Sequence, residues 1–358
     1  MISVKHVTSI AVVAALSVGA AAATVGASVP DSTTVATTVP AELEDLYAPQ
    51  PLAEETTLKI AISSRIESFL NLLLADAMGE FEKENITVEF EVVPTSDSTL
   101  LLSQGRVDAV PTSMSAGNFN LIGDGGLIRG VIPLHGEPEG SGQGFWVRTD
   151  ALGGDGFQPS DLEGQRVLTP SGPGSYSVAY FWDTVLREAG LSATDITWER
   201  IGVSDAPLAL TSGAASAALV LTPFWQVVED DGCCEFIGGY PQDPISFVAF
   251  GPNLLNDNPE AGQAFVRAVA RTTVTYLQGD YHNDPEVSSV AAELLEQPLD
   301  VFQSQPSLVW SPDFAFDVAN FDVVQDFFRD ADVLSYETPL TLDDIFDPRF
   351  IDALGDGS

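Results

Sequence analysis

Positive charge is what this sequence lacks most. Of its 358 residues, 14 are Lys or Arg and 52 are Asp or Glu, which gives a formal net charge of −38. The only lysines are Lys5, Lys59 and Lys83. Phosphate backbones are bound by clustered Lys and Arg, so the composition argues against a nucleic-acid partner. The carboxylates are not spaced like an EF-hand loop either, so the acidity indicates a soluble surface rather than a calcium site.

Cysteine and histidine are also scarce. The two cysteines, Cys233 and Cys234, are adjacent, and the three histidines are His6, His135 and His282. In an exported chain such a cysteine pair forms a vicinal disulfide or stays reduced and buried, and the sequence leaves both alternatives open. No histidine lies near the pair, so we predict neither a Cys–His catalytic pair nor a metal site, and no catalytic residue or cofactor.

The N-terminus has the pattern of an export signal. Lys5 and His6 precede an uncharged run over residues 7–29 that is rich in Ala, Val and Gly. A short positive segment, an apolar run and small residues at its end predict a cleaved secretory signal over 1–28 and an extracytoplasmic protein, periplasmic or at the cell surface. Left uncleaved, the run is long enough to anchor the chain in a membrane, although its composition makes a weak anchor. No cysteine follows it, so we expect no lipoprotein anchor.

Residues 29–57 differ in composition from the rest of the chain. They are rich in Thr, Val, Ala and Glu and contain Pro30, Pro40, Pro49 and Pro51. This composition predicts an extended tether that does not pack on the fold, which we expect to begin near Leu58.

Strand and helix patterns alternate from Leu58 onward. The spacing of apolar residues predicts strand 58–62, a helix through 70–81, strand 88–92, a helix through 100–102 that ends at Gly105, and strand 107–110. Strands that alternate with helices at this spacing indicate a parallel α/β sheet with right-handed crossovers.

The same alternation restarts after a glycine-rich break at 153–156. It predicts strand 167–169, a loop over 171–175, a helix over 178–189, strand 197–201, a helix through 208–210 and strand 217–221. The later helices, 259–277, 286–296 and 318–328, lack local strands and are expected to pack on the first sheet after the chain returns through 245–250.

These patterns predict an α/β protein of two lobes, each a mostly parallel sheet flanked by helices. The first lobe comprises 58–147 plus 246–358 and the second 148–245, and two crossover strands near 145–148 and 247–250 join them. A two-strand connection between lobes is a natural hinge.

Several short motifs carry a family resemblance. LKIAI at 58–62, GRVDA at 105–109, PSDLEGQRV at 159–167, LREAGL at 186–191 and NPE at 258–260 occur in this order. With these motifs the chain resembles the substrate-binding proteins of ABC importers for nitrate, sulfonates, taurine and thiamine precursors, over residues 58–354. The resemblance implies the type II periplasmic binding protein fold, an extracytoplasmic location and delivery of a solute to a membrane permease.

The second lobe departs from the family pattern. Where the family often has Gly-x-Val-Asp-Ala and then Glu-Pro, this chain has GAASA at 213–217 and Thr222-Pro223. A ligand contact through a family carboxylate at position 222 is therefore not expected here.

Ligands of open α/β sheets bind outside the carboxyl ends of the strands. This rule selects loops 63–66, 111–115, 135–144, 171–176 and 222–225. Within them, we predict the following ligand-binding residues: Ser64, Arg65, Thr112, Ser113, His135, Gly172, Gly174, Ser175, Tyr176, Thr222 and Trp225.

Each of these residues also has a structural interpretation. Loop 171–175 precedes a helix and could hold an anion with its N–H groups, or could be a simple capped turn. The hydroxyls of Thr112 and Ser113 could bind a ligand or cap the next helix. Arg65 could hold an oxyanion by two hydrogen bonds or pair with Glu67 on the surface. His135 could be a pH-sensitive contact, and the rings of Phe145, Tyr176, Phe224 and Trp225 could line the pocket or the core.

The leading functional hypothesis is a monomeric, non-enzymatic solute-binding protein of an ABC importer. It would capture a small organic or anionic solute and would have two partners, the solute and an ABC permease in the membrane. Two alternatives remain open: a fold-related biosynthetic enzyme of the thiamine-pyrimidine or menaquinone type, and a sensory or adhesive binding module without a transporter.

Overall fold

The computed structural model describes residues 47–355, except for 153–155, 223, 240–245 and 317. The predicted signal at 1–28 and the tether up to residue 46 lie outside the described residues. Within the described part, no helix combines the length and apolar character needed to cross a membrane.

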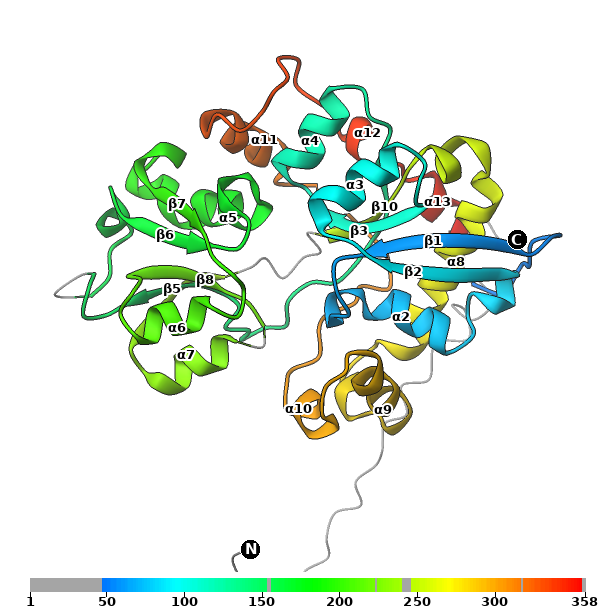
Figure 1. Cartoon of the computed structure of the whole chain (residues 1–358), viewed down its shortest axis with the longest axis horizontal. Helices are drawn as coiled ribbons and strands as arrows, with labels where there is room; N and C mark the ends of the chain where they lie inside the picture. The colour runs from blue at the N-terminus through cyan, green and yellow to red at the C-terminus, as the bar shows by residue number, and fades with distance from the viewer. Residues whose placement is uncertain (1–46, 153–155, 223, 240–245, 317, 356–358) are drawn as a thin grey trace, which may run out of the picture. The chain divides into compact units, whose positions relative to one another are not determined.

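The first sheet has five strands in the order β2-β1-β3-β10-β4 (Figure 1). Its strands are β1 (Thr56–Ile62), β2 (Ile86–Val92), β3 (Ala109–Ser113), β4 (Arg129–Pro133) and β10 (Ser246–Phe250). β1 pairs in parallel with β2 and β3, whereas β10 is antiparallel to both of its neighbours. Four of the five strands therefore run in one direction.

The second sheet repeats this plan, in the order β7-β6-β8-β5-β9. Its strands are β5 (Gly144–Arg148), β6 (Arg166–Thr169), β7 (Thr197–Arg200), β8 (Ala217–Val220) and β9 (Cys234–Gly239). β6 pairs in parallel with β7 and β8, and β5 is antiparallel to β8 and β9. The predicted class, two mostly parallel sheets with helices on them, is confirmed.

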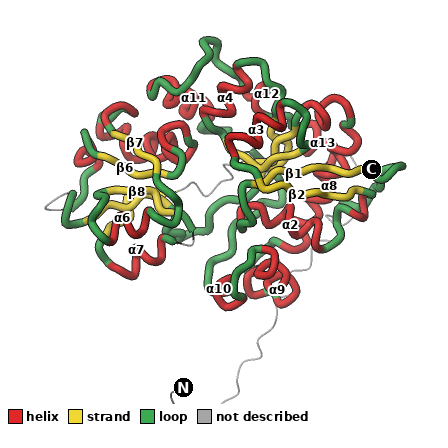
Figure 2. The backbone as a smooth tube through the Cα atoms, viewed as in Figure 1, coloured by secondary structure: helices red, strands yellow, loops and turns green. Residues whose placement is uncertain are grey.

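Helices cover both faces of each sheet (Figure 2). They are α2 (Leu70–Ala77), α3 (Thr95–Ser103), α4 (Ala116–Gly123), α5 (Tyr176–Phe181), α6 (Ala206–Thr211), α7 (Trp225–Asp231), α8 (Pro259–Tyr276), α9 (Pro285–Leu294), α10 (Leu299–Gln303), α11 (Phe321–Asp330), α12 (Leu342–Ile345) and α13 (Arg349–Gly355).

Side-chain alternation along the strands sorts the helices between the two faces. On β5, Phe145 and Val147 pack in the same cluster as α5, while Trp146 between them packs with α6 and α7. On β1, Ile60 joins α2 and α8, and Ala61 joins α3 and α4. The period of two along each strand accounts for this arrangement.

The predicted boundary between the tether and the fold, at residues 57 and 58, lies too late in the chain. Tyr47 is only 4% exposed and belongs to the first core cluster, the backbone of Leu52 bonds to Glu84, and β1 already begins at Thr56. Tyr47 and Leu52 therefore attach this segment to the first core, because α8 and the turn before β2 offer partners that the local composition does not reveal.

Sheet membership moves the first boundary between the predicted lobes. The predicted first lobe runs to residue 147, but β5 is an interior strand of the second sheet. The change of sheet therefore lies in residues 134–143. On the return, β10 joins the first sheet between β3 and β4.

Helix α11 differs from the prediction in its partners. It was expected on the first sheet alone. Its Phe328 does pack there, with 5.7 Å between the ring centroids of Phe328 and Phe119 of α4. Its Phe327, however, packs on Trp182, which directly follows α5 of the second sheet, with 5.4 Å between the ring centroids. One core cluster therefore contains residues of both sheets, with α11 among them.

Candidate functional site

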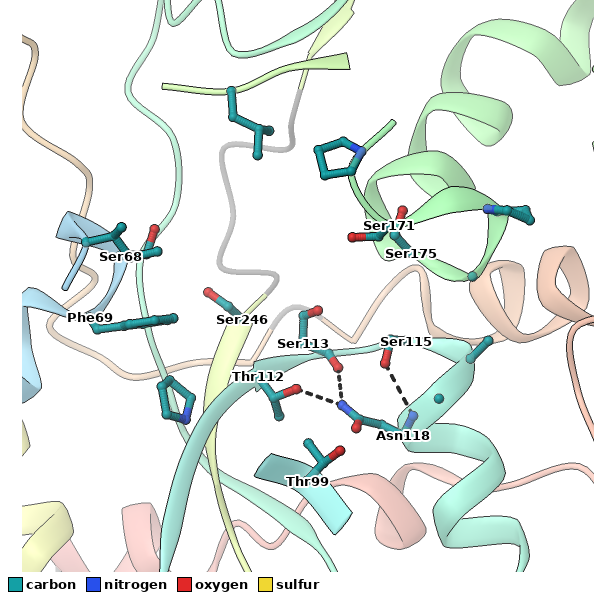
Figure 3. A pocket seen from close by; sticks show the side chains of 18 of the residues that line it. Ser68, Phe69, Thr99, Thr112, Ser113, Ser115, Asn118, Ser171, Ser175 and Ser246 are labelled. Atoms are coloured by element: carbon teal, nitrogen blue, oxygen red, sulfur yellow. Dashed lines mark hydrogen bonds between the residues drawn. The ribbon is translucent and has the colours of Figure 1, made fainter. Parts of the chain in front are cut away.

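A cavity of about 970 Å³ is lined by loops at the carboxyl ends of strands from both sheets (Figure 3). Its walls come from the β3–α4 turn, the β6–α5 loop, the short helix η1 (Glu67–Phe69) and the connection 134–143. Many of the lining side chains are hydroxyls: Ser68, Thr99, Thr112, Ser113, Ser115, Ser171, Ser175 and Ser246. The position agrees with the topological rule used on the sequence.

The β3–α4 wall is ordered by Asn118. Its side-chain amide donates to Thr112 Oγ1 and to the Ser113 carbonyl, both at 2.8 Å, and its backbone N–H donates to Ser115 Oγ at 3.3 Å. Figure 3 shows these three bonds below the cavity. Ser115 is thus the N-cap of α4, and Thr112 accepts a bond that leaves its own hydroxyl hydrogen free to turn elsewhere.

The β6–α5 wall is a tight turn. Gly172 has φ +69°, and its N–H donates to Thr169 Oγ1 at 2.8 Å. Ser175 Oγ contacts the Gly172 carbonyl and Ser177 Oγ, at 3.3 and 3.1 Å. The N–H of Gly172 is therefore already used inside the turn, and the cavity is bordered instead by Ser171, Gly174 and Ser175.

The two walls meet at one end of the cavity. Ser115 and Ser175 form an antiparallel backbone bridge. A Cβ atom on Gly174 would lie 3.1 Å from the Cβ of Ala116, so the close approach explains the glycine.

The connection 134–143 forms a third wall. Glu137, 5% exposed, accepts from Ser141 Oγ at 3.0 Å and from Gln143 Nε2 at 2.7 Å, and Gln143 Oε1 accepts from the Thr222 N–H at 2.8 Å. Burial raises the pKa of the Glu137 carboxyl to about 7, helped by nearby Glu67 and opposed by the Ser141 and Gln143 hydrogen bonds.

A buried network supports the wall that carries Ser68 and Phe69. Glu67, the residue before Ser68, accepts a hydrogen bond from the Tyr281 hydroxyl and lies 2.6 Å from His282 Nε2. The other ring nitrogen, His282 Nδ1, lies 2.9 Å from the Gln305 carbonyl oxygen. Both ring nitrogens of His282 therefore lie within hydrogen-bond distance of an oxygen, which fixes the orientation of the ring.

His135 lines the cavity beside Trp310, with 5.5 Å between the ring centroids. Burial lowers its pKa, against a smaller opposing effect of the Gly136 carbonyl, so the ring is neutral at pH 7.

Five of the predicted ligand-binding residues line the cavity. They are Thr112, Ser113, His135, Gly174 and Ser175. Their contact with a ligand stays a prediction.

The other six predicted residues do not line it. Ser64 and Arg65 are exposed, and Glu67, the alternative partner of Arg65, bonds Tyr281 and His282 instead. β1 ends at Ile62, as predicted, and Ile66, Ser68 and Phe69 of the next segment line the cavity instead.

The remaining four lie behind the walls. Gly172 is inside its turn, and Tyr176 is 1% exposed and stacks on Tyr180. Thr222 donates its N–H to Gln143, and Trp225 packs over Gly142, where an added Cβ would lie 2.3 Å from the indole ring. Phe145 and Phe224 are likewise packing residues, because Phe145 stacks on Phe181 and Phe224 joins the cluster under α6 and α7.

Sequence reasoning missed four lining residues with distinctive chemistry: Phe69, Glu137, Gln143 and Arg200. Glu137 and Gln143 lie in a loop that was selected, and Arg200 lies near the end of the predicted strand 197–201, so a search for charged residues at strand ends would have found Arg200.

The cysteines form the disulfide, which decides between the two alternatives. It begins β9, where the Cys233 carbonyl accepts from the N–H and the hydroxyl of Thr149. No cluster of three or more His, Cys, Asp or Glu suited to a metal ion occurs among residues 47–355 as described.

Comparison of the sequence finds no matching protein-family model, and no curated protein matches it. Comparison of the structure does find similar proteins. The alkanesulfonate-binding protein SsuA from Xanthomonas axonopodis pv. citri, bound to MOPS, matches with a TM-score of 0.60 at 16% identity over 82% of this chain and 99% of that one. The chain has the periplasmic binding protein fold.

Two further similar structures widen the range of functions. The periplasmic nitrate-binding protein NrtA from Synechocystis PCC 6803 gives a TM-score of 0.57 at 14% identity, over 86% of this chain and 89% of that one. A mutant of the enzyme DszB in complex with biphenyl-2-sulfinic acid gives 0.51 at 17% identity, over 84% and 99%. At these identities the similarity establishes the fold, and the resemblance seen in the motifs is confirmed at that level.

Proposed function

We propose that the chain is an extracytoplasmic solute-binding protein of an ABC importer that encloses one small organic or anionic solute between its two sheets. The observation that supports this most is the cavity, whose walls come from the strand ends of both sheets. A site divided in this way closes when the sheets approach each other, and its solute completes hydrogen bonds on both sides.

The lining favours a polar organic solute. Hydroxyl side chains of the lining, the amide of Gln143 and the guanidinium of Arg200 can donate to an oxyanion. The volume of about 970 Å³ lies at the upper end of ordinary ligand pockets and far exceeds a nitrate ion, and Phe69 adds an apolar surface. Sulfonates, taurine-like compounds and thiamine pyrimidines fit this description better than nitrate.

The remaining parts of the proposal concern assembly and place. We assign residues 47–133 and 246–355 to one lobe and 144–239 to the other, with the chain crossing between them twice. The protein is exported, acts as a monomer and passes its solute to an ABC permease in the membrane.

The proposal includes that the protein binds its solute without catalysing a reaction. The fold alone does not decide this point, because DszB shares it. An enzyme would return a changed compound after incubation, whereas a binding protein returns the same one, and mass spectrometry of the recovered solute distinguishes the two.

A thermal-shift screen of the exported chain against alkanesulfonates, taurine, nitrate, thiamine pyrimidines and flavin tests the function. A solute at 100-fold its Kd stabilises the protein by about 2.7 kcal/mol. We expect this shift in the wild type and in the control Ser64→Trp, whose position is outside the cavity, and its loss in Ser113→Trp, which fills the cavity. Equal shifts in both variants, or no shift with any compound, would contradict the proposal.

A further inference from the structure

Glu137 is a carboxylic acid in the wall of the cavity. It lies on the connection between β4 and β5, it is 5% exposed, and the surface it retains lines the cavity. Carboxylates are rarely buried to this extent unless a cation or a metal faces them.

The partners of Glu137 hold its carboxyl in place without neutralising it. Ser141 and Gln143 donate one neutral hydrogen bond each, one to each carboxylate oxygen. No salt bridge between described residues includes Glu137. Each carboxylate oxygen can accept a second bond, so the group has unused capacity beside the cavity.

Among the described residues, the charged and titratable groups around it add no positive charge. Glu67 on η1 acts on Glu137 through its like charge. His135 on the same connection is kept neutral by burial, which lowers its pKa. The carboxyl is therefore neutralised either by a proton or by a cation that enters the cavity, and burial accordingly raises its pKa to about 7.

A positively charged side chain of the second sheet, Arg200, lines the same cavity. Arg200 ends β7 and extends over the β6–α5 loop, where its Nε lies 3.5 Å from the position of a Cβ on Gly172. Among the described lining residues, Glu137, His135 and Arg200 are the ones with titratable side chains. The cavity thus has a negative wall at the connection 134–143 and a positive one at the second sheet.

We infer that the solute is a small zwitterion, with a protonated amine that Glu137 binds and an oxyanion that faces Arg200 and the hydroxyls of the β6–α5 loop. The inference rests on the proposed function and narrows its substrate class. The desolvation of a buried carboxylate is offset when an ammonium group reaches it, so a solute without the amine leaves the charge uncompensated and binds more weakly.

Matched pairs of compounds test this by titration calorimetry. The probes are ω-aminoalkanesulfonates and ω-hydroxyalkanesulfonates of two to six carbons, beginning with taurine and isethionate, which differ only in the amine. At pH 8 we expect the wild type to prefer the amine of the best-fitting pair at least tenfold. The isosteric Glu137→Gln should reduce that preference to less than threefold while retaining affinity for the hydroxyl compound.

Glu139→Gln is the matched control, because Glu139 is exposed on the same connection and does not line the cavity. It should keep the wild-type preference, and thermal melting of all three proteins checks that each is folded.

The pH dependence gives an independent readout. Amine affinity in the wild type should fall about tenfold per pH unit below pH 7, because protonated Glu137 no longer attracts the ammonium. In Glu137→Gln it should be flat over the same range.

The outcomes separate the two levels of the proposal. Preferred binding of hydroxyl compounds or of nitrate, or an amine preference that survives in Glu137→Gln, overturns the zwitterion and leaves the solute-binding function standing. Binding of no compound in the screen overturns the function itself.

Discussion

At the scale of single residues, the arginines differ in how deeply they are buried and in how much they should stabilise the fold. Arg267 and Arg271 of α8 form a buried network with Glu84 and Glu80: Arg267–Glu84 at 2.7 Å, Arg271–Glu80 at 2.6 Å and Arg271–Glu84 at 2.8 Å. The side chain of Glu84 is fully buried and that of Arg267 is 8% exposed. Burial raises the pKa of Glu80, but its bonds to Arg271 and Lys83 outweigh that effect and lower it. Charges so deeply buried are tolerated only while their partners of opposite charge are present.

Arg267→Met should therefore destabilise the protein strongly, because it leaves Glu84 buried with one cation instead of two. We expect a loss of about 3–5 kcal/mol in the free energy of unfolding, measured by urea denaturation. The control is Arg166→Met, since Arg166 and Glu199 form a pair at 3.1 Å with both side chains about half exposed. It should cost less than about 1 kcal/mol, and equal losses for the two variants would refute the argument.

The sequence alone did not identify which arginine lines the cavity. Arg65 follows the end of β1 and Arg200 is the last residue of β7, and the sequence alone favours Arg65. In the structure both arginines are exposed, but Arg200 lines the cavity and Arg65 does not. Which way a residue after a strand points depends on the turn that follows, and η1 turns Ser68 and Phe69 inward in place of Arg65.

At the scale of elements, the segment 47–52 is part of the fold. The Tyr47 carbonyl accepts from Arg271 at 2.7 Å and its ring packs edge-on against Phe314 at 6.0 Å. Arg267 donates to the Gln50 carbonyl at 3.0 Å, and Asn85 to the Leu52 carbonyl at 3.0 Å. The segment thus completes the hydrogen bonds of the buried arginines.

Deleting this segment tests its role. A chain that begins at Glu54 should be less stable than one that begins at Tyr47 by about 2 kcal/mol or more, the free energy of burying one large apolar side chain. Thermal melting of the two chains measures the difference, and Arg271 would lose its Tyr47 acceptor only in the shorter one. Equal melting temperatures would show that residues 47–53 contribute nothing to the core.

Most element types follow from local patterns, and several boundaries do not. The predicted helix through 70–81 ends at Ala77 as α2, because Gly79 adopts φ +71° and turns the chain. Asn85, before β2, adopts the left-handed conformation, with φ +62°. Asn and Gly are the residues that adopt positive φ most easily, so both turns have a local cause.

At the scale of the whole molecule, the backbone bridge between Ser115 and Ser175 joins the walls of the cavity. Together with α11, which packs on helices of both sheets, it holds the sheets at one end of the site. Residues paired across an antiparallel bridge have Cα atoms about 4.5–5.5 Å apart, within the range that a disulfide spans.

The double variant Ser115→Cys with Ser175→Cys should therefore form a disulfide spontaneously in air, in addition to the one between Cys233 and Cys234. If solute enters by separation of the two sheets, the reduced variant without solute should have a larger radius of gyration in small-angle scattering than the oxidised one. Thiol titration confirms the cross-link. Identical scattering curves for the two forms would count against entry by hinge opening.

The sequence by itself determined the alternation of strands and helices, the second copy of that alternation and the edge of the sheets where a ligand would bind. These features repeat every two to four residues or follow from chain order, so local patterns contain them. Only the tertiary structure decided that β5 and β10 enter the sheets as antiparallel strands, that Tyr47 belongs to the core, and that Glu137 and Arg200, but not Arg65, line the same cavity. Each of these depends on contacts between segments far apart in the chain, and no local pattern encodes which distant partner a buried group will have.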